Sequence, residues 1–179
     1  MRRVHALPTT GMTMVEVTAV LVIMTLLMTM AVPSLGSFVA RHRLRAAAEH
    51  LATDLGEARH EAAKRRQTMH LAIASGSHWC YAIATAASAA CDGSDSRALR
   101  SVRGSEHPGI TVIEASPFSF DPATGASLAN KAQLNGAAAV HGHAVLASSR
   151  GDVVQVRISQ LGRPAVCAMD APVGNLPRC

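Results

Sequence analysis

The feature that most constrains this chain is a long stretch without charge near its amino terminus. Residues 17–40 contain no Asp, Glu, Lys or Arg. A bilayer core about 30 Å thick is crossed by roughly 20 apolar residues as a helix, so this stretch is long enough to span a membrane. A cleavable secretory signal has an apolar region of only about 7–15 residues before its cleavage site. The sequence therefore predicts a membrane-spanning helix over residues 12–40.

A single acid, Glu16, stands at the start of this stretch. A carboxylate at the bilayer centre costs about 2.5–3.5 kcal/mol even on a lenient insertion scale, so Glu16 is expected near an interface or with a cationic partner. Ahead of it lie Gly11, Met12 and a short leader that carries Arg2 and Arg3. The two arginines favour a cytoplasmic amino terminus. A plain signal anchor accounts for the length of the stretch but not for this arrangement.

The segment from Gly11 to Glu16 resembles the type III signal of type IV pilins and type II secretion pseudopilins. The resemblance implies that residues 1–11 are a leader, which a prepilin peptidase removes by cutting between Gly11 and Met12. The same enzyme would methylate the new amino terminus of Met12, a position where the family most often has Phe. Glu16 would then neutralise the Met12 ammonium of a neighbouring subunit in the filament. Pro33 falls where many pilins have a proline, and a kink or local melting of the helix is expected there.

Residues 41–66 predict an amphipathic continuation of the helix. Apolar residues recur at alternating steps of four and three, which places them on one helical face. We expect that face to pack on a sheet and the charged residues to form the solvated face. The cluster of Arg41, Arg43 and Arg45 follows the apolar stretch on its far side and opposes the topology that the leader favours. The stripe residues are Leu44, Ala48, Leu51, Leu55, Ala58 and Ala62.

Residues 67–179 have the composition of a small β domain. Alternating or β-favouring residues predict strands, including hairpins at each end of the region, and a turn over 121–125. Residues 126–142 are predicted to be loop, and the tail from Gly162, with Pro164, Pro172 and Pro177, to be mostly irregular. The fold class is therefore α+β, a long helix on an antiparallel β domain. The predicted strands are 68–75, 79–84, 99–103, 110–114, 117–120, 143–148 and 152–159.

Four cysteines in a segment that leaves the cytoplasm predict disulfides, because oxidising compartments let them persist. Three pairings are open, and the sequence-local one, Cys80 with Cys91 and Cys167 with Cys179, is favoured. A four-cysteine zinc site is disfavoured because no two cysteines have the short spacing such sites use. His141 and His143 could supply half a metal site, but no further ligand is identifiable. The sequence thus predicts neither metal nor cofactor, and it shows no catalytic motif of an enzyme.

Within the β region, segments 79–81, 118–125 and 158–163, with Cys167 after them, resemble the GspH/FimT family of minor pilins. FimT proteins of DNA-uptake pili carry a Gly-Arg-x-Arg motif that grips DNA. This chain has Gly162 and Arg163 but Ala165 in place of the second arginine. Phosphate contacts depend on charge more than on a fixed order of residues, so other arginines are candidates to compensate. The candidate DNA contacts are Arg163, Arg157, Arg150 and Arg178.

Three functions remain open from the sequence. The favoured one is a FimT-like minor pilin, held in the inner membrane by one span with residues 67–179 in the periplasm, that helps to start or join a type IV pilus and binds DNA. The second is a GspH-like minor pseudopilin of a type II secretion system. The third is a membrane-anchored periplasmic binding protein without a filament role.

Composition says little about nucleic-acid binding. The net charge of the chain falls from +5 to +3 when Arg2 and Arg3 leave with the leader, and five aromatic residues are too few for a base-stacking platform.

Overall fold

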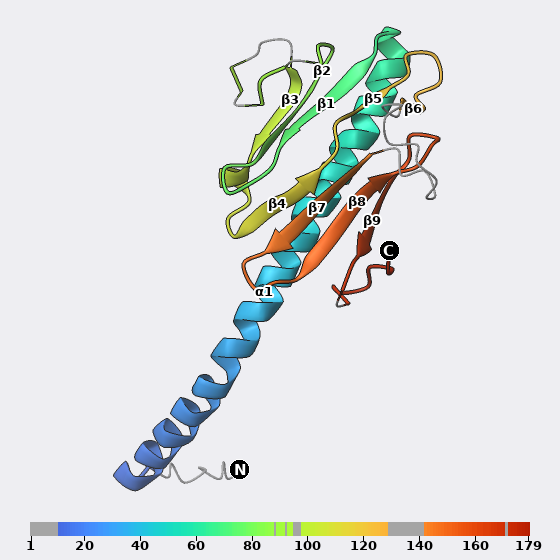
Figure 1. Cartoon of the computed structure of the whole chain (residues 1–179). Coiled ribbons are helices and arrows are strands. Elements are labelled where there is room, and N and C mark those ends of the chain that lie inside the picture. Colours follow the sequence, from blue (N-terminus) through green and yellow to red (C-terminus); the bar gives the residue numbers. More distant parts are fainter. Residues whose placement is uncertain (1–10, 88, 92, 95–97, 129–141, 171) are drawn as a thin grey trace, which may run out of the picture. The chain divides into compact units, whose positions relative to one another are not determined.

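One long helix, α1 (Met14–Arg65), contributes to both compact units of the chain, Met1–Phe38 and Val39–Cys179. The structure is a computed structural model that describes residues 11–87, 89–91, 93–94, 98–128, 142–170 and 172–179. The helix runs through position 33 without interruption, so the local melting expected at Pro33 is not seen. In the second unit the chain forms an α+β fold, with α1 beside antiparallel sheets (Figure 1).

The carboxyl end of α1 is closed by a Schellman-type turn. The backbone N–H of Gln67 donates to the carbonyl of Ala62 at 3.2 Å, and Arg66 between them has a φ of 53°. Glycine usually occupies this left-handed position because a side chain is strained there. The turn ends the helix and leads the chain directly into the first strand.

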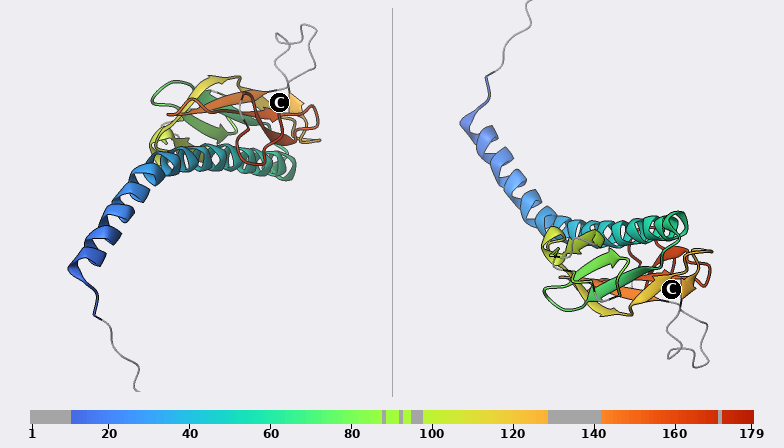
Figure 2. Two further views of the ribbon diagram at one scale, coloured as in Figure 1. Left: turned by 90° about the horizontal axis from the view of Figure 1, so that it is seen from below. Right: turned by 90° about the horizontal axis from the view of Figure 1, so that it is seen from above.

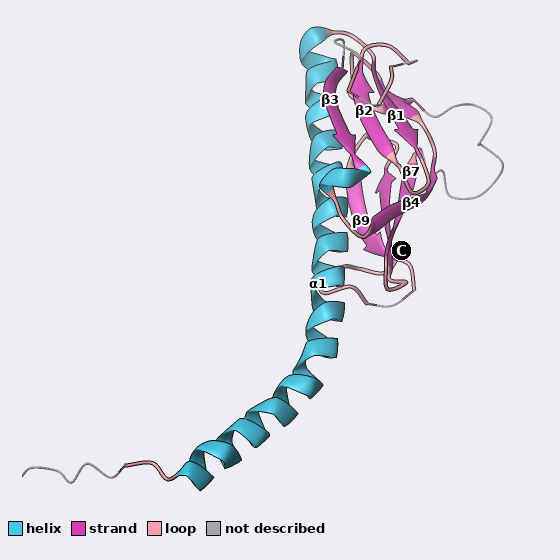
Figure 3. Ribbon diagram, turned by 90° about the vertical axis from the view of Figure 1, so that its left-hand side faces the viewer, coloured by secondary structure: helices cyan, strands magenta, loops and turns pink. Residues whose placement is uncertain are grey.

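The predicted apolar stripe of α1 is buried in this unit. All six stripe residues are at most 2% exposed, and Ala47 joins them in the core. In Figures 2 and 3 the strands lie along one side of this part of the helix. Inward-facing residues of both sheets, such as Tyr81, Phe120 and Leu146, complete the same core. The 3.6-residue periodicity of the sequence therefore identified the packing face of α1 correctly.

In the described part of the chain, nine strands form two antiparallel sheets. Sheet A has the order β3-β2-β1-β5-β6 and sheet B the order β4-β7-β8-β9. The hairpins β1–β2 and β7–β8 are those that the sequence predicts. The bounds are β1 Met69–Ala74, β2 Cys80–Ala84, β3 Ala98–Arg103, β4 Ile110–Ala115, β5 Phe118–Phe120, β6 Ser127–Leu128, β7 His143–Ser148, β8 Val153–Ile158 and β9 Pro164–Ala168, with a short 3-10 helix η1 at Gly104–Glu106.

The two sheets are joined by hydrogen bonds from the β1–β2 connection of sheet A to β4 of sheet B. The backbone N–H of Gly76 donates to the carbonyl of Val112 at 2.9 Å. The indole N–H of buried Trp79 donates to the carbonyl of Ile110 at 2.8 Å. These bonds satisfy polar groups that burial would otherwise leave unpaired, so sheets A and B form a common wall against α1.

Two short strands lie in regions that the sequence predicts as loop or irregular tail. Most of the described tail is irregular, as expected, but it includes β9, which adds a strand to sheet B, and Ala168 also bridges to Arg178. Pro164 is compatible with this strand because it is its first residue at the sheet edge, where a proline is tolerated. Within the predicted loop 126–142, Ser127 and Leu128 form β6 against β5. Residues 129–141 lie outside the described part of the chain.

Candidate functional site

Helix α1 begins immediately after the predicted cleavage site. Gly11, Met12 and Thr13 are non-helical, and Met12 is 73% exposed. The backbone N–H of Glu16 donates to the Thr13 hydroxyl at 3.3 Å, which makes Thr13 the N-cap of α1. The Gly11–Met12 bond thus lies in exposed, non-helical backbone, which is the form of backbone that a protease can accommodate. Glu16 occupies the first turn of the helix.

The described side chains in the first half of α1 expose apolar surface on every face. Leu21, Ile23 and Leu26 are each more than half exposed, although they point in different directions around the helix. The hydroxyls of Thr18, Thr25 and Thr29 each donate to a backbone carbonyl three or four residues earlier. Such bonds satisfy hydroxyl groups without water. Within the described residues, no helix meets the length and hydropathy required of a membrane span.

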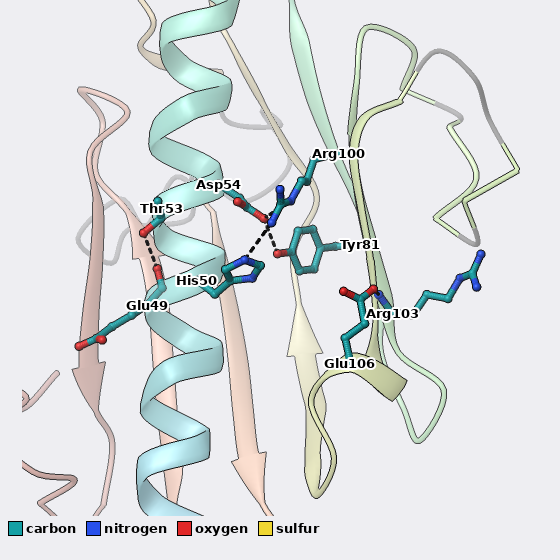
Figure 4. Close-up of polar contacts among 8 residues, drawn as sticks. All are labelled: Glu49, His50, Thr53, Asp54, Tyr81, Arg100, Arg103 and Glu106. Carbon is teal, nitrogen blue, oxygen red and sulfur yellow. Dashed lines mark hydrogen bonds and ion pairs between the residues drawn. The ribbon is translucent and has the colours of Figure 1, made fainter.

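A buried acid links α1 to sheet A. Asp54 is 5% exposed; its Oδ2 accepts a hydrogen bond from the Tyr81 hydroxyl at 2.7 Å and from Nε of Arg100 at 3.1 Å (Figure 4). Burial, and then the hydrogen bond to Asp54, raise the pKa of Tyr81 far above its usual value. We call these three residues the Asp54 cluster. The expectation that the charged residues of 41–66 are only a solvated face is therefore wrong for Asp54.

Two histidines extend the Asp54 cluster toward the core. Nη2 of Arg100 lies 2.9 Å from Nε2 of His50, and because a guanidinium only donates, Nε2 is the acceptor. The proton of neutral His50 then lies on Nδ1, which is buried without a hydrogen-bond partner among the described residues. The ring of His107 lies 5.5 Å from that of His50, and burial is the main cause that lowers the pKa of His107. The cluster fixes sheet A against α1.

The predicted DNA-contact arginines fall into two groups. Arg163 is exposed in the turn before β9, and Arg157 is exposed on β8 directly opposite Ala165. Arg150 lies in the β7–β8 turn, and Arg178 is level with Ala168 at the other end of β9. The antiparallel register thus brings Arg157 and Arg163 together and leaves Arg150 and Arg178 at the opposite end of these strands.

Gly162 holds the corner that carries Arg163. Its φ is +73°, and a Cβ at this position would collide with the carbonyl oxygen of Gly125. Nε of Arg59 on α1 donates to the same carbonyl at 3.2 Å. The turn before Gly125 is itself fixed by Asp121, whose carboxylate accepts hydrogen bonds from the backbone N–H and hydroxyl of Thr124 and from the backbone N–H of Ala123. These bonds, those from Thr124 first, lower the pKa of Asp121. Two segments that resemble the family thus meet at one packed corner.

The cysteines form the sequence-local pairs, Cys80 with Cys91 and Cys167 with Cys179. Histidine 143 has Nε2 3.2 Å from a Glu114 carboxylate oxygen and Nδ1 3.3 Å from the Ser116 hydroxyl. Among the described residues, no three His, Cys, Asp or Glu side chains are grouped to hold a metal. His141, the other half of the predicted pair, lies outside those residues.

A family model described as the type II transport protein GspH matches residues 47–162. The chain belongs to the GspH family. The match covers α1 from residue 47 to its end and strands β1 to β8. It ends at Gly162, in the packed corner just described. GspH proteins are structural, pilin-like components of a filament. Membership of this family supports a minor pilin or pseudopilin role for the chain and implies that it interacts with other pseudopilins in a filament. No curated protein and no solved structure matches the chain.

Sequence reasoning missed the role of Asp54, although a signal was present. Residues 47, 51, 54 and 58 follow the same alternation of four and three as the apolar stripe, and the other three are buried alanines or a leucine. An acid at a core spacing indicates a buried carboxylate with a partner. The partner itself, Tyr81, could not be identified because the register of sheet A relative to α1 is a tertiary feature.

Proposed function

We propose that this GspH-family chain is a minor subunit of a pilus-like filament, anchored in the inner membrane through residues 12–40 until it is extracted into the filament. The observation that carries the proposal is the start of α1. An exposed, non-helical Gly11–Met12 bond is followed at once by a capped helix with an acid in its first turn and apolar side chains on all its described faces. Such a surface needs lipid or other helices to cover it.

Cleavage at this bond would create a positive charge at the amino group of Met12, with which the carboxylate of Glu16 can pair. The new ammonium of Met12 would be a cation two residues before the start of α1, and Glu16 is a carboxylate on an otherwise uncharged surface. An acid in a low-dielectric setting gains strongly from a cationic partner, so docking of one subunit beside another would pair the two groups. Pro33, which α1 includes, is proposed to let the helix repack between membrane and filament.

The proposal is tested by replacing Glu16 with alanine and following processing and assembly separately. The Glu16→Ala protein should be cleaved by the prepilin peptidase yet be absent from sheared filaments. Glu57→Ala is the matched control, because Glu57 is an exposed acid on the same helix in the globular unit. Normal incorporation of Glu16→Ala into filaments would refute the pairing. Failure of the peptidase to cut the wild-type chain would instead favour an anchored binding protein.

For the kind of filament, we infer a FimT-like minor pilin of a type IV pilus with a DNA contact at the Gly162 corner. Arg157 supports this inference because it stands across from Ala165, where the family motif has its second arginine. Cross-strand neighbours have Cβ atoms about 5 Å apart, so Arg157 can supply the missing charge on the same face. The GspH-like pseudopilin is the second candidate, favoured by the description of the matching family and by Ala165 itself.

A gel shift of the full-length chain in detergent across salt concentrations tests the DNA contact. R157Q/R163Q should weaken the shift, whereas R150Q/R178Q, which removes the same charge at the opposite end of the strands, should leave most of it. Loss of two phosphate contacts should also reduce the salt slope by about 2. An unshifted probe at low salt with the wild-type chain would eliminate DNA binding and leave the pseudopilin as the better candidate.

A further inference from the structure

Five arginines gather at one end of the Val39–Cys179 unit, and we call them the basic collar. Three come from the first turns of α1 in this unit. The β7–β8 turn is held against them by an ion pair at 3.2 Å between Nε of Arg41 and Asp152. The tail also passes beside α1 here, since a Cβ added to Gly174 would lie 3.3 Å from Nη1 of Arg45. The collar residues are Arg41, Arg43, Arg45, Arg150 and Arg178.

Most of the collar's charge is not neutralised within the unit. Arg41 and Arg45 have partners in Asp152 and Glu49. The exposed guanidinium groups of Arg43, Arg150 and Arg178 have no ion-pair partner in the described part of the chain. Asp170, two residues after β9, is an exposed carboxylate near this end. The collar therefore presents a net positive surface, to which anions are attracted.

The sequence places the three α1 arginines of the collar directly after the uncharged stretch. The 24 residues from 17 to 40 extend about 36 Å as a helix at 1.5 Å per residue, slightly more than a bilayer core of about 30 Å. With this stretch in the bilayer, as proposed above, Arg41, Arg43 and Arg45 would lie at the level of the lipid headgroups. The positive-inside rule places an excess of Lys and Arg on the cytoplasmic side of a membrane helix, whereas these arginines follow the span on its periplasmic side. The orientation of the helix therefore does not account for them.

We propose that the basic collar binds the anionic phospholipid headgroups of the outer leaflet and so seats the globular unit on the membrane before the subunit enters a filament. Three features select this partner: the headgroup level that the proposed insertion gives to the α1 arginines, the net positive charge of the collar, and its assembly from α1, the β7–β8 turn and the tail. The proposal rests on the membrane insertion of residues 12–40 proposed above. DNA, the other polyanion considered, is assigned to the Arg157 and Arg163 group.

The test uses full-length protein in nanodiscs that contain phosphatidylethanolamine with a minor fraction of phosphatidylglycerol. After transfer to detergent, native mass spectrometry measures the ratio of phosphatidylglycerol to phosphatidylethanolamine that remains bound. Three proteins are compared: wild type, the collar variant R43Q/R150Q/R178Q, and the charge-matched control R66Q/R157Q/R163Q. Each basic residue near an anionic surface is worth about fivefold in partitioning, so wild type and control should retain phosphatidylglycerol well above its bulk fraction. The collar variant should retain it near that fraction.

Equal lipid ratios for the wild type and the collar variant would overturn the proposal, and so would an equal loss in both variants. If added duplex DNA displaced the bound lipid, and the collar variant but not the control lost its gel shift, the collar would be a nucleic-acid site instead. Membrane insertion is read out separately by the yield of protein in nanodiscs. A chain that does not insert at all contradicts the proposed anchoring, whereas a collar failure leaves the insertion unchanged.

Discussion

The Asp54 cluster should be the polar contact on which the stability of the globular unit depends most. Asp54→Ala leaves the hydroxyl of Tyr81, a residue 1% exposed, without its 2.7 Å partner. Loss of a hydrogen bond to a charged group costs about 1.5–3 kcal/mol. The Arg100 side chain is 44% exposed, so its ion pair adds at most about 1 kcal/mol, and alanine returns about 0.5 kcal/mol in helix propensity. The expected loss in unfolding free energy is about 2 kcal/mol.

The assay is thermal unfolding followed by the fluorescence of Trp79, which is the sole tryptophan and is 2% exposed. For a chain of this size, about 2 kcal/mol corresponds to a drop of roughly 4–8 °C in Tm. Tyr81→Phe should cost a similar amount, and the double variant clearly less than the sum, because both changes remove one bond. Glu57→Ala, an exposed control on the same helix, should change stability by about 0.5 kcal/mol or less. Additive losses, or an Asp54→Ala protein as stable as the control, would refute the cluster's role.

Four further predictions concern the same unit. Folding raises the pKa of Tyr81, so the stability that Tyr81 contributes is fully present below its unfolded pKa of about 10 and is lost as the pH rises above that value. Tyr81→Phe should therefore flatten the alkaline limb of a Tm–pH profile. Gly162→Ala should lower Tm by several degrees, whereas Gly56→Ala, where a Cβ meets no atom within 4 Å, should raise it. Arg66→Gly should stabilise by about 1 kcal/mol in chemical denaturation, because glycine relieves the left-handed strain. Removing the Cys167–Cys179 pair with two serines should cost about 3 kcal/mol in the same assay, given its sequence separation of 12.

The parts of the fold that periodicity controls could be predicted from the sequence. Alternating steps of four and three identified the buried face of α1, and alternation with turn residues located both hairpins. Both depend on local geometry, which the sequence records directly. The strand β9 was missed because three prolines in the tail suggested irregular structure, although Pro164 needs no ladder bond at the first position of an edge strand.

The candidate sites were predictable only as far as they depend on neighbours in the chain. Glu16 is identified from residues beside it, since its acid interrupts an apolar run. The four arginines were grouped by type, and only the register of β8 and β9 shows that Arg157 and Arg163 lie together while Arg150 and Arg178 lie elsewhere. The role of Gly162 likewise required tertiary structure, because the carbonyl that excludes a Cβ belongs to Gly125, distant in sequence.

The central claim is that this chain is matured into a filament subunit, and an intact-mass measurement of the protein isolated from its native membrane tests it most directly. The account predicts a chain that begins at Met12, carries one methyl group on its amino terminus and retains the whole of α1. A mass that still includes residues 1–11, or one that shows a cut beyond Pro33 with the apolar helix removed, would contradict it.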